Sequence, residues 1–212
     1  MHDSIQDLPL YEVPAAGSGE TLGLLITGDG GWASLDQQVS AELALRGISV
    51  VGLSSLRYFW HSRTPELAAH DVTEVLRHYL AQWRRTRIVL IGYSFGANVL
   101  PFIVNRLPQD LRARVISVNL LAPEVNARFQ ASVAGWNRAS LEPSVPLAPE
   151  LSRMGNVPVL CVYGEGEKDS LCPSLAQREV TSVHIGSGHH FSRKYGALAA
   201  EIAAFPGNTS AR

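Results

Sequence analysis

The chain alternates short, almost continuously apolar runs with stretches of helical periodicity. The runs cover residues 22–27, 48–53, 87–93, 115–121, 157–163 and 180–185, and a further strand is expected at residues 10–13. An apolar run without polar alternation is typical of a strand that is buried on both faces. Strands that are separated by helices favour a parallel sheet. The sequence therefore predicts an α/β fold with a mostly parallel central sheet and helices on both faces.

The length of the chain, 212 residues, suits one domain. We expect a single domain over residues 1–212, with loose termini at 1–8 and 207–212. Capping residues predict a helix from Ser34, with Gln37 completing a capping box, and another that begins with Thr64-Pro65. Residues 122–155 form a longer connection, and we expect a small lid or none. Such a connection is often functional, but an ordinary surface excursion fits equally well.

The composition excludes several classes of protein. Apolar residues make up 46% of the chain, charged residues 17%, and the formal net charge is −1, so the chain is globular and no basic field points to nucleic acid. No apolar stretch is long enough to span a bilayer. Residues 1–10 have neither a basic nor an apolar region, so no signal peptide is expected here, although one could have been removed. Cys161 and Cys172 are too few for a disulfide scaffold; they suit free thiols or a single bridge.

The segment Gly92-Tyr93-Ser94-Phe95-Gly96 lies where an apolar run passes into a helix. A sharp turn between strand and helix exposes the hydroxyl of the central serine above the sheet edge, and the glycines leave room for the neighbouring backbone. This setting is typical of the nucleophile of an α/β-hydrolase. Ser94 is therefore the predicted nucleophile.

A serine needs a base, and in this fold the chain order is serine, acid, histidine. Three histidines follow Ser94: His184, His189 and His190. His184 falls within a predicted strand, whereas His189 and His190 lie in the loop after it. The loop pattern favours His189 as the base, with His190 as the alternative. Adjacent histidines are a poor pair of zinc ligands, and no metal or organic cofactor is expected.

The acid of the triad is expected in the loop that follows the preceding strand. The aspartates after Ser94 are Asp110 and Asp169, and Asp110 ends a helix on the wrong side of the sheet. Asp169 is therefore the predicted acid, with Glu165 and Glu167 as weaker candidates. Its role is to hold the imidazole tautomer and to stabilise the imidazolium.

Two backbone amides are expected to form the oxyanion hole, those of Phe95 and Asp29. Asp29 lies in the glycine-rich exit loop of the first buried strand, and the carboxylate would sit near a developing negative charge. We therefore expect Asp29, with Glu165 or Glu167, to favour a substrate with a positive group. The predicted substrate-binding residues are Gly28, Gly30, Trp32 and Glu167. Packing is the favoured role of the aromatic side chains at Trp32, Tyr58, Phe59 and Trp60.

Several motifs together resemble one family. They are Thr27-Gly-Asp-Gly-Gly-Trp32, Gly92-Tyr-Ser-Phe-Gly-Ala97, Glu167-Lys-Asp-Ser170 and Gly188-His-His-Phe191. This set is similar to the bacterial virulence protein family of VirJ and the C-terminal domain of AcvB, over about residues 22–205. The resemblance implies an α/β-hydrolase fold, a periplasmic location and a link to type IV secretion. It also implies a triad of Ser94, Asp169 and His189, and a disulfide between Cys161 and Cys172.

The resemblance further implies hydrolysis of an aminoacyl ester, notably that of lysyl-phosphatidylglycerol. The expected partners are then an ester substrate at a membrane surface and secretion-system proteins, without nucleic acid. Two alternatives stay open: a carboxylesterase or thioesterase that acts on small acyl substrates, and a non-enzymatic secretion factor on a hydrolase scaffold. Fold and triad are shared by many hydrolases, so they do not fix the substrate.

Overall fold

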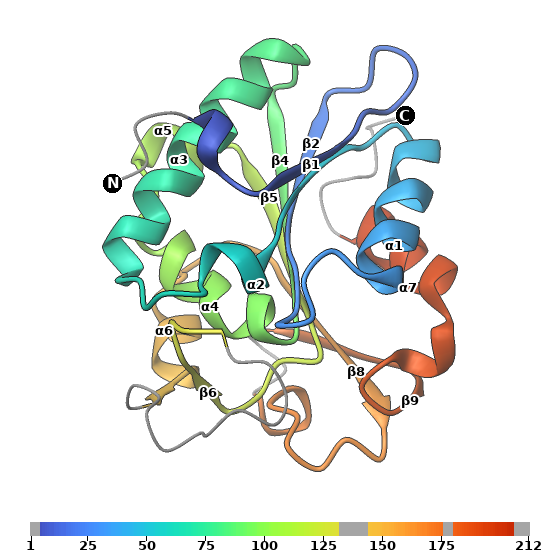
Figure 1. Ribbon diagram of the computed structural model, residues 1–212. Helices are drawn as coiled ribbons and strands as arrows, with labels where there is room; N and C mark the ends of the chain where they lie inside the picture. Colours follow the sequence, from blue (N-terminus) through green and yellow to red (C-terminus); the bar gives the residue numbers. More distant parts are fainter. Residues whose placement is uncertain (1–4, 132–143, 176–179, 206–212) are drawn as a thin grey trace.

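The computed structural model describes residues 5–131, 144–175 and 180–205 (Figure 1). Its main sheet has seven strands in the order β1-β3-β2-β4-β5-β8-β9. The strands are β1 (Leu10–Val13), β2 (Thr21–Ile26), β3 (Ser49–Leu53), β4 (Arg87–Tyr93), β5 (Val115–Leu121), β8 (Val159–Glu165) and β9 (Thr181–Ser187). All neighbours pair in parallel except β1, which runs antiparallel to β3. The predicted mostly parallel sheet is confirmed.

Helices cover both faces of the sheet (Figure 1). The longer ones are α1 (Ser34–Leu45), α3 (Pro65–Gln82), α4 (Phe95–Val104) and α7 (Tyr195–Ala204). One hydrophobic cluster includes residues of α3 and α4, and the other includes residues of α1 and α7. Leu24 of β2 belongs to the first cluster and Leu25 to the second. Successive side chains of a strand point to opposite faces of the sheet, and here both faces are covered by helices. Neighbouring residues of the strand must therefore both be apolar, which explains the continuous apolar runs.

The helix starts were predicted with mixed success. Thr64 caps α3 as expected: its hydroxyl accepts a hydrogen bond from the amide of Leu67 at 3.2 Å. The capping box predicted for α1 is wrong in its residues. The N-cap is Ala33, and the carboxylate of Asp36 accepts a hydrogen bond from the Ala33 amide at 3.0 Å. Asp36 can do this because it is the third helical residue, where a carboxylate reaches back to the cap.

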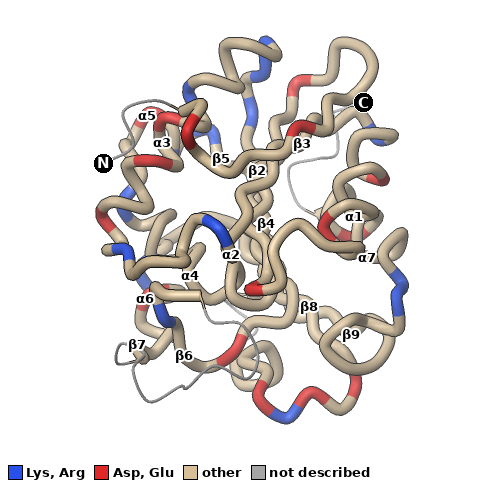
Figure 2. The backbone as a smooth tube through the Cα atoms, viewed as in Figure 1, with Lys and Arg blue, Asp and Glu red and all other residues tan. Residues whose placement is uncertain are grey.

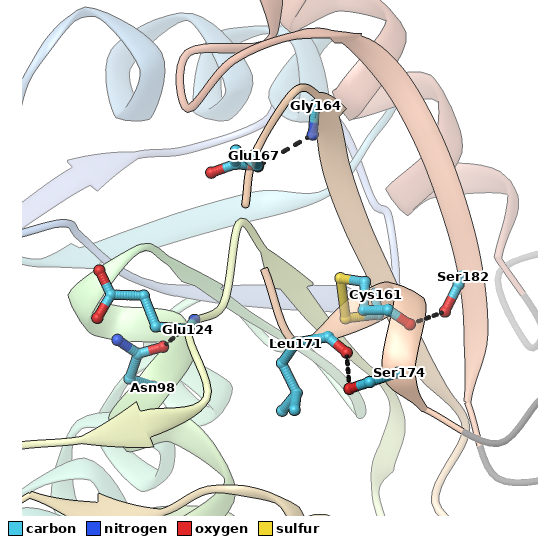
Figure 3. Close-up of a disulfide and its surroundings, with 9 residues drawn as sticks. Asn98, Glu124, Cys161, Gly164, Glu167, Leu171, Ser174 and Ser182 are labelled. Atoms are coloured by element: carbon cyan, nitrogen blue, oxygen red, sulfur yellow. Dashed lines mark hydrogen bonds between the residues drawn. A yellow bond between two sulfur atoms is a disulfide. The ribbon is translucent and has the colours of Figure 1, made fainter. Parts of the chain in front are cut away.

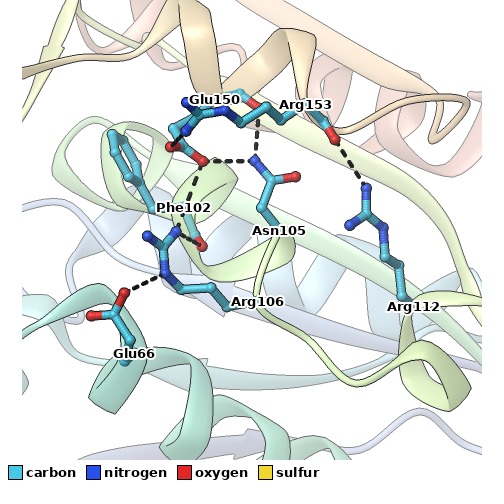
Figure 4. Close-up of polar contacts among 7 residues, drawn as sticks. All are labelled: Glu66, Phe102, Asn105, Arg106, Arg112, Glu150 and Arg153. Carbon is cyan, nitrogen blue, oxygen red and sulfur yellow. Dashed lines mark hydrogen bonds and ion pairs between the residues drawn. The ribbon is translucent and has the colours of Figure 1, made fainter.

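The longer connection contributes a small two-stranded sheet and a short helix. They are β6 (Asn126–Ala127), β7 (Val145–Pro146) and α6 (Ala148–Ser152). Glu150 of α6 is buried. Its carboxylate accepts a hydrogen bond from Asn105 at 2.7 Å and forms an ion pair with Arg153 at 2.6 Å (Figure 4). Arg106 lies 3.8 Å from the same carboxylate and 2.8 Å from Glu66. These contacts fix α6 against the end of α4.

The remaining elements are short. They are the helices α2 (Ser55–Tyr58) and α5 (Gln109–Arg112) and the 3-10 turns at Ile5–Asp7, Cys172–Ser174 and Phe191–Arg193. Within the expected loose terminus at 1–8, Ile5 and Leu8 pack against the first hydrophobic cluster, Gln6 and Asp7 are exposed, and residues 1–4 lie outside the described part of the chain. The expected loose end at 207–212 lies outside the described residues. Among the described helices, none is long and apolar enough to cross a membrane.

The architecture is that of an α/β-hydrolase, as predicted. In the parallel part of the sheet the strands end at one edge, and ligands of open α/β sheets bind beyond the carboxyl ends of the strands. The loops after β2, β4, β5, β8 and β9 therefore meet where a site is expected. The described residues place no lid domain over this edge.

Candidate active site

Ser94 occupies the turn between β4 and α4. Its backbone has φ 51° and ψ −114°, a conformation that residues with a side chain rarely adopt. Its amide donates a hydrogen bond to the carbonyl of Leu121 at 2.8 Å, which anchors the turn to β5. A Cβ atom on Gly92 would lie 2.6 Å from the backbone of Gly96, and one on Gly96 would collide with the carbonyl of Ile26. The two glycines of the motif are thus required for this turn to pack.

His189 faces the nucleophile. Its Nε2 lies 2.7 Å from the hydroxyl oxygen of Ser94, within hydrogen-bond distance. His190, the alternative base, points elsewhere: its Nδ1 lies 2.9 Å from the hydroxyl of Tyr93. The Tyr93 hydroxyl also donates to the carbonyl of His189 at 3.2 Å. The geometry therefore selects His189 as the partner of Ser94, and Tyr93 holds the histidine loop.

The acid beside His189 is Glu167, and the expectation of Asp169 is corrected. Glu167 Oε1 lies 2.6 Å from His189 Nδ1, and its Oε2 accepts a hydrogen bond from the Gly164 amide at 3.0 Å. A carboxylate only accepts, so Nδ1 carries the proton and Nε2 of the neutral ring accepts from Ser94. The structure thus gives His189 the tautomer that a general base needs.

Local geometry explains why the glutamate takes this place. β8 continues to Glu165, two residues beyond the predicted strand end, and a turn follows with φ +81° at Gly166. The amide of Glu167 donates to the carbonyl of Gly164 at 3.3 Å, which directs Glu167 back toward the histidine loop. Asp169 lies further along and lines the neighbouring cavities. Glu165 is exposed, and its carbonyl accepts from the Gly188 amide at 2.8 Å.

The protonation of the pair follows from these contacts. The hydrogen bond to Glu167 raises the pKa of His189 above its ordinary value of 6.5, although partial burial opposes the shift. The negative charges of Glu167, Glu124 and Asp29 raise it further. Burial alone would raise the pKa of Glu167, but the hydrogen bonds from His189 and the Gly164 amide outweigh it, so the pKa is below 4.5. Glu167 is therefore ionised at neutral pH.

A cavity of about 380 Å³ opens beside Ser94. It is lined by Asp29, Ser94, Phe95, Asn98, Glu124, Val125, Asn126, Arg128, Gln130, Ser144 and Asp169. A second hollow of about 360 Å³ contacts Glu167 and His189, and shares Glu124 and Asp169 with the first. The Ser94 hydroxyl thus lies beside a pocket that is large enough for a small acyl ester.

The two residues predicted for the oxyanion hole, Asp29 and Phe95, both line this cavity. Phe95 is the first residue of α4, and its amide has no carbonyl acceptor within that helix. Among the described residues, no backbone carbonyl accepts from the amide of Asp29 or Phe95. Both donors are therefore open to an oxygen atom of a ligand.

The expected substrate-binding set is only partly brought together. Gly28 lies against the nucleophile turn, where a Cβ atom would be 3.4 Å from the Cβ of Ser94, whereas Gly30 faces open space. Trp32 is a packing residue: it stacks on Tyr11 with ring centres 4.9 Å apart and lies over Gly52, and it is not among the residues that line the Ser94 cavity. Glu167 contacts His189 instead of a ligand. Tyr58 and Phe59 are buried, as expected for packing, while Trp60 is 45% exposed.

The sequence of the chain matches a known family model, described as bacterial virulence protein (VirJ), over residues 20–205. The chain belongs to the VirJ family. A comparison with curated proteins finds no significant match. The motifs that resemble VirJ at Gly92–Ala97 and Gly188–Phe191 are those that supply Ser94 and His189 to the site, and Glu167 also lies in one of these motifs.

The fold of this VirJ family member is similar to those of solved α/β-hydrolases. Est1E from Butyrivibrio proteoclasticus, solved with bound ferulic acid, is 14% identical, with a TM-score of 0.64 and 92% of each chain covered. A thioesterase domain from the curacin biosynthetic pathway is 16% identical, with a TM-score of 0.60, 92% of this chain and 94% of that one. A serine hydrolase without a lid from Xanthomonas campestris is 18% identical, with a TM-score of 0.53, 93% of this chain and 84% of that one. At such identities the likeness shows the fold.

A disulfide joins Cys161 and Cys172, the pairing that the resemblance to VirJ implies (Figure 3). Cys161 lies on β8, and Cys172 opens the 3-10 turn after the loop that carries Glu167. The carbonyl of Cys172 also accepts a hydrogen bond from Ser182 of β9 at 3.1 Å. The disulfide therefore ties the end of the loop that carries Glu167 to β8.

Sequence reasoning missed four residues of the site: Tyr93, Asn98, Glu124 and Arg128. Asn98 lies one helical turn after Ser94, so the (i, i+4) spacing placed it on the same face as the nucleophile. Glu124 follows β5 by three residues, a position at the carboxyl edge of the sheet that was treated only as part of a long connection. Tyr93 and Arg128 had no distinguishing local pattern.

Proposed function

We propose that this protein is a serine ester hydrolase in which Ser94 is the nucleophile, His189 the base and Glu167 the acid. The observation that carries the proposal is the continuous pair of hydrogen bonds, 2.7 Å from Ser94 to His189 and 2.6 Å from His189 to Glu167. A serine hydroxyl is a weak nucleophile unless a base accepts its proton. This arrangement supplies the base and fixes its orientation.

The reaction proceeds in two halves. The Ser94 oxygen attacks the carbonyl carbon as His189 Nε2 takes the hydroxyl proton, and Glu167 stabilises the imidazolium. The amides of Phe95 and Asp29 donate to the oxyanion. The carbon–oxygen bond to the leaving alcohol breaks, and His189 returns its proton to that alcohol. Water, deprotonated by His189, then attacks the acyl-serine and releases the acid and the free Ser94 hydroxyl.

The substrate class that we propose is the aminoacyl ester of an aminoacylated phosphatidylglycerol, notably the lysyl form. Membership of the VirJ family supports this choice. So does the charge around the nucleophile, because Asp29, Glu124 and Asp169 line the cavity beside Ser94. Figure 2 shows acidic positions along the loop after β8 and beside β6. An ester bond in a lipid head group could reach the open cavity while the acyl chains stay in the bilayer.

We also propose a periplasmic location, in which the protein meets its lipid at the membrane surface and contributes to type IV secretion. The disulfide between Cys161 and Cys172 supports this location, because such bonds persist in oxidising compartments such as the bacterial periplasm. The chain carries no strong net charge that would hold it on a membrane by itself. Contacts with secretion-system proteins are a further part of the proposal.

A second candidate is a carboxylesterase or thioesterase that acts on small acyl groups. The observation that favours it is the similarity of the fold to an esterase and to a thioesterase domain. The same triad would serve that reaction, since the two candidates differ in the acyl group and the leaving group and share the steps at Ser94.

One assay distinguishes the candidates. The protein and its Ser94→Ala variant are incubated with lysyl-phosphatidylglycerol micelles and, separately, with short p-nitrophenyl esters. Release of free lysine by the protein, lost in the variant, is the expected result. Turnover of the small esters alone would favour the second candidate. If Ser94→Ala changed neither rate, or neither substrate were cleaved, the hydrolase proposal would be wrong and a binding role on a hydrolase scaffold would replace it.

A further inference from the structure

Three carboxylates line the cavity beside the nucleophile: those of Asp29, Glu124 and Asp169. All three residues are exposed to solvent, and none forms an ion pair with another residue in the described parts of the chain. Among the described residues that line the cavity, Arg128 is the one basic side chain. A cleft lined mainly by one sign of charge attracts ions of the opposite sign.

Glu124 and Asp169 come from two segments that are tied together. The amide of Leu171 donates to the carbonyl of Pro123 at 2.9 Å, and a backbone bridge joins Glu124 to Ser170. Asp169 is the neighbour of Ser170 and lines both hollows, as Glu124 does. The two carboxylates therefore lie at the junction of the hollows that contact Ser94 and His189.

Glu167, the other carboxylate of this region, is not available to a ligand. One of its oxygens accepts a hydrogen bond from His189. The other accepts one from the Gly164 amide (Figure 3). Asp29 already has a proposed role, because its backbone amide is a proposed donor to the oxyanion. Glu124 and Asp169 are thus the carboxylates without an assigned task in the reaction.

Asn98 adds a hydrogen-bond donor to the wall of the same cavity. The residue as a whole is 6% exposed. Its Oδ1 accepts a hydrogen bond from the Glu124 amide at 2.8 Å, which fixes the orientation of the side-chain amide (Figure 3). The other polar atom, Nδ2, has no acceptor among the described residues. This atom is not among the fully buried polar atoms that lack a partner, so it is open to the cavity, where it can donate to a ligand oxygen.

We propose that Glu124, Asp169 and Asn98 form a subsite for the aminoacyl group, in which the two carboxylates bind the ammonium and Asn98 Nδ2 donates to an oxygen of the same ester. An aminoacyl ester carries both groups on neighbouring carbon atoms, so one ligand satisfies the acceptors and the donor. Arg128, at the wall of the cavity, suits the phosphodiester of the leaving alcohol. The inference rests on the proposed function and assigns its selectivity to residues outside the triad.

The test compares two substrates that differ in one group. Alanyl-phosphatidylglycerol and lactyl-phosphatidylglycerol have an ammonium and a hydroxyl at the same carbon. The protein is expected to favour the alanyl ester in kcat/KM by tenfold or more, about 1.4 kcal/mol or more. Glu124→Gln and Asp169→Asn are each expected to lower this preference by about tenfold, through KM more than through kcat. Glu165→Gln is the matched control, because this exposed carboxylate lies at the end of β8, just before the loop that carries Asp169, and does not line the Ser94 cavity.

A binding measurement separates this inference from the proposed function. The Ser94→Ala protein is titrated calorimetrically with alanyl-glycerol and with lactyl-glycerol, which it does not turn over. Tighter binding of the alanyl ester, lost on adding Glu124→Gln or Asp169→Asn, supports the subsite whatever the rate of hydrolysis. Equal binding of the two esters would overturn the subsite, and so would a preference that both substitutions leave intact. Ser94-dependent hydrolysis without any alanyl preference would leave the hydrolase standing and remove the subsite.

Discussion

Replacement of Glu167 by glutamine tests which carboxyl group completes the triad. Glu167→Gln keeps the size of the side chain but removes the charge, and an amide can donate to Nδ1 as well as accept from it. His189 would then lose the stabilisation of its protonated form, and the ring could adopt the tautomer that cannot accept the proton of Ser94. The substitution therefore affects the chemical step, whereas the pocket beside Ser94 keeps its shape.

The expected size of the effect follows from the contacts. The bond lost is a 2.6 Å charge-assisted hydrogen bond to a carboxylate that is 12% exposed at the side chain. Removal of the equivalent charge in a serine protease triad lowers kcat by about 10⁴, which corresponds to about 5 kcal/mol of transition-state stabilisation. Because the His189 side chain is 39% exposed and water can replace part of the interaction, we expect a loss of about 10²–10⁴ in kcat.

The assay is the hydrolysis of p-nitrophenyl acetate, a neutral ester for which recognition of an ammonium plays no part. Asp169→Asn is the matched control, because it removes a charge two residues away that the structure places outside the triad. We expect its kcat to stay within about threefold of the parent, against a loss of at least about 100-fold in Glu167→Gln. The opposite ranking of the two variants would refute the assignment and restore Asp169 as the acid.

Three further predictions follow from the same geometry. The value of kcat/KM should rise with pH as His189 loses its proton, with a midpoint above 6.5. Glu167→Gln should move that midpoint to lower pH, because the hydrogen bond that raises the pKa of His189 is gone. A pH–rate profile of each protein measures both midpoints. Gly96→Ala should lower the free energy of unfolding by about 1–3 kcal/mol in urea titrations, because its methyl group meets backbone atoms; an unchanged midpoint would contradict the packing. Cys161→Ala combined with Cys172→Ala should cost about 2–4 kcal/mol of stability, and equal stability with and without the bridge would argue against its role.

The fold was predictable because burial on two faces leaves a direct mark on the sequence. The strand at residues 87–93 and the strand at residues 115–121 have the bounds that were predicted. The helix cap at Thr64 was equally predictable from the sequence, because threonine is preferred at the N-cap and proline at the first helical position. The start of α1 was misjudged by one residue because Ser34 is a favourable N-cap and Ala33 is not; the carboxylate of Asp36, at the third helical position, caps the helix instead.

The site was predictable as far as chain order and motif determine it. Ser94 and His189 lie in loops with a recognisable pattern, and the structure brings them together. The acid was misassigned because the chain carries three acidic residues within five positions, one at the end of β8 and two in the loop after it, and aspartate was preferred by residue type. What decides is the length of β8 and the turn at Gly166, which direct Glu167 toward His189. Neither is encoded in a short motif.

The contribution of residues 122–155 was left open by the sequence. The structure places Glu124 and Arg128 of this connection on the wall of the Ser94 cavity, while α6 packs on the end of α4. Such placement depends on long-range contacts, for example the hydrogen bond from the Glu124 amide to Asn98. Contacts of this kind join residues that are far apart in the chain, so a local sequence pattern does not predict them.

The central claim, that His189 activates Ser94 as a nucleophile, can be tested most directly by covalent labelling. The protein is treated with a fluorophosphonate, a reagent that labels activated serines, and the site of the adduct is located by mass spectrometry of peptides. One adduct is expected, on Ser94, and it should form at least about 100-fold more slowly in His189→Ala. An adduct on another residue, or labelling of Ser94 at the same rate without His189, would contradict it.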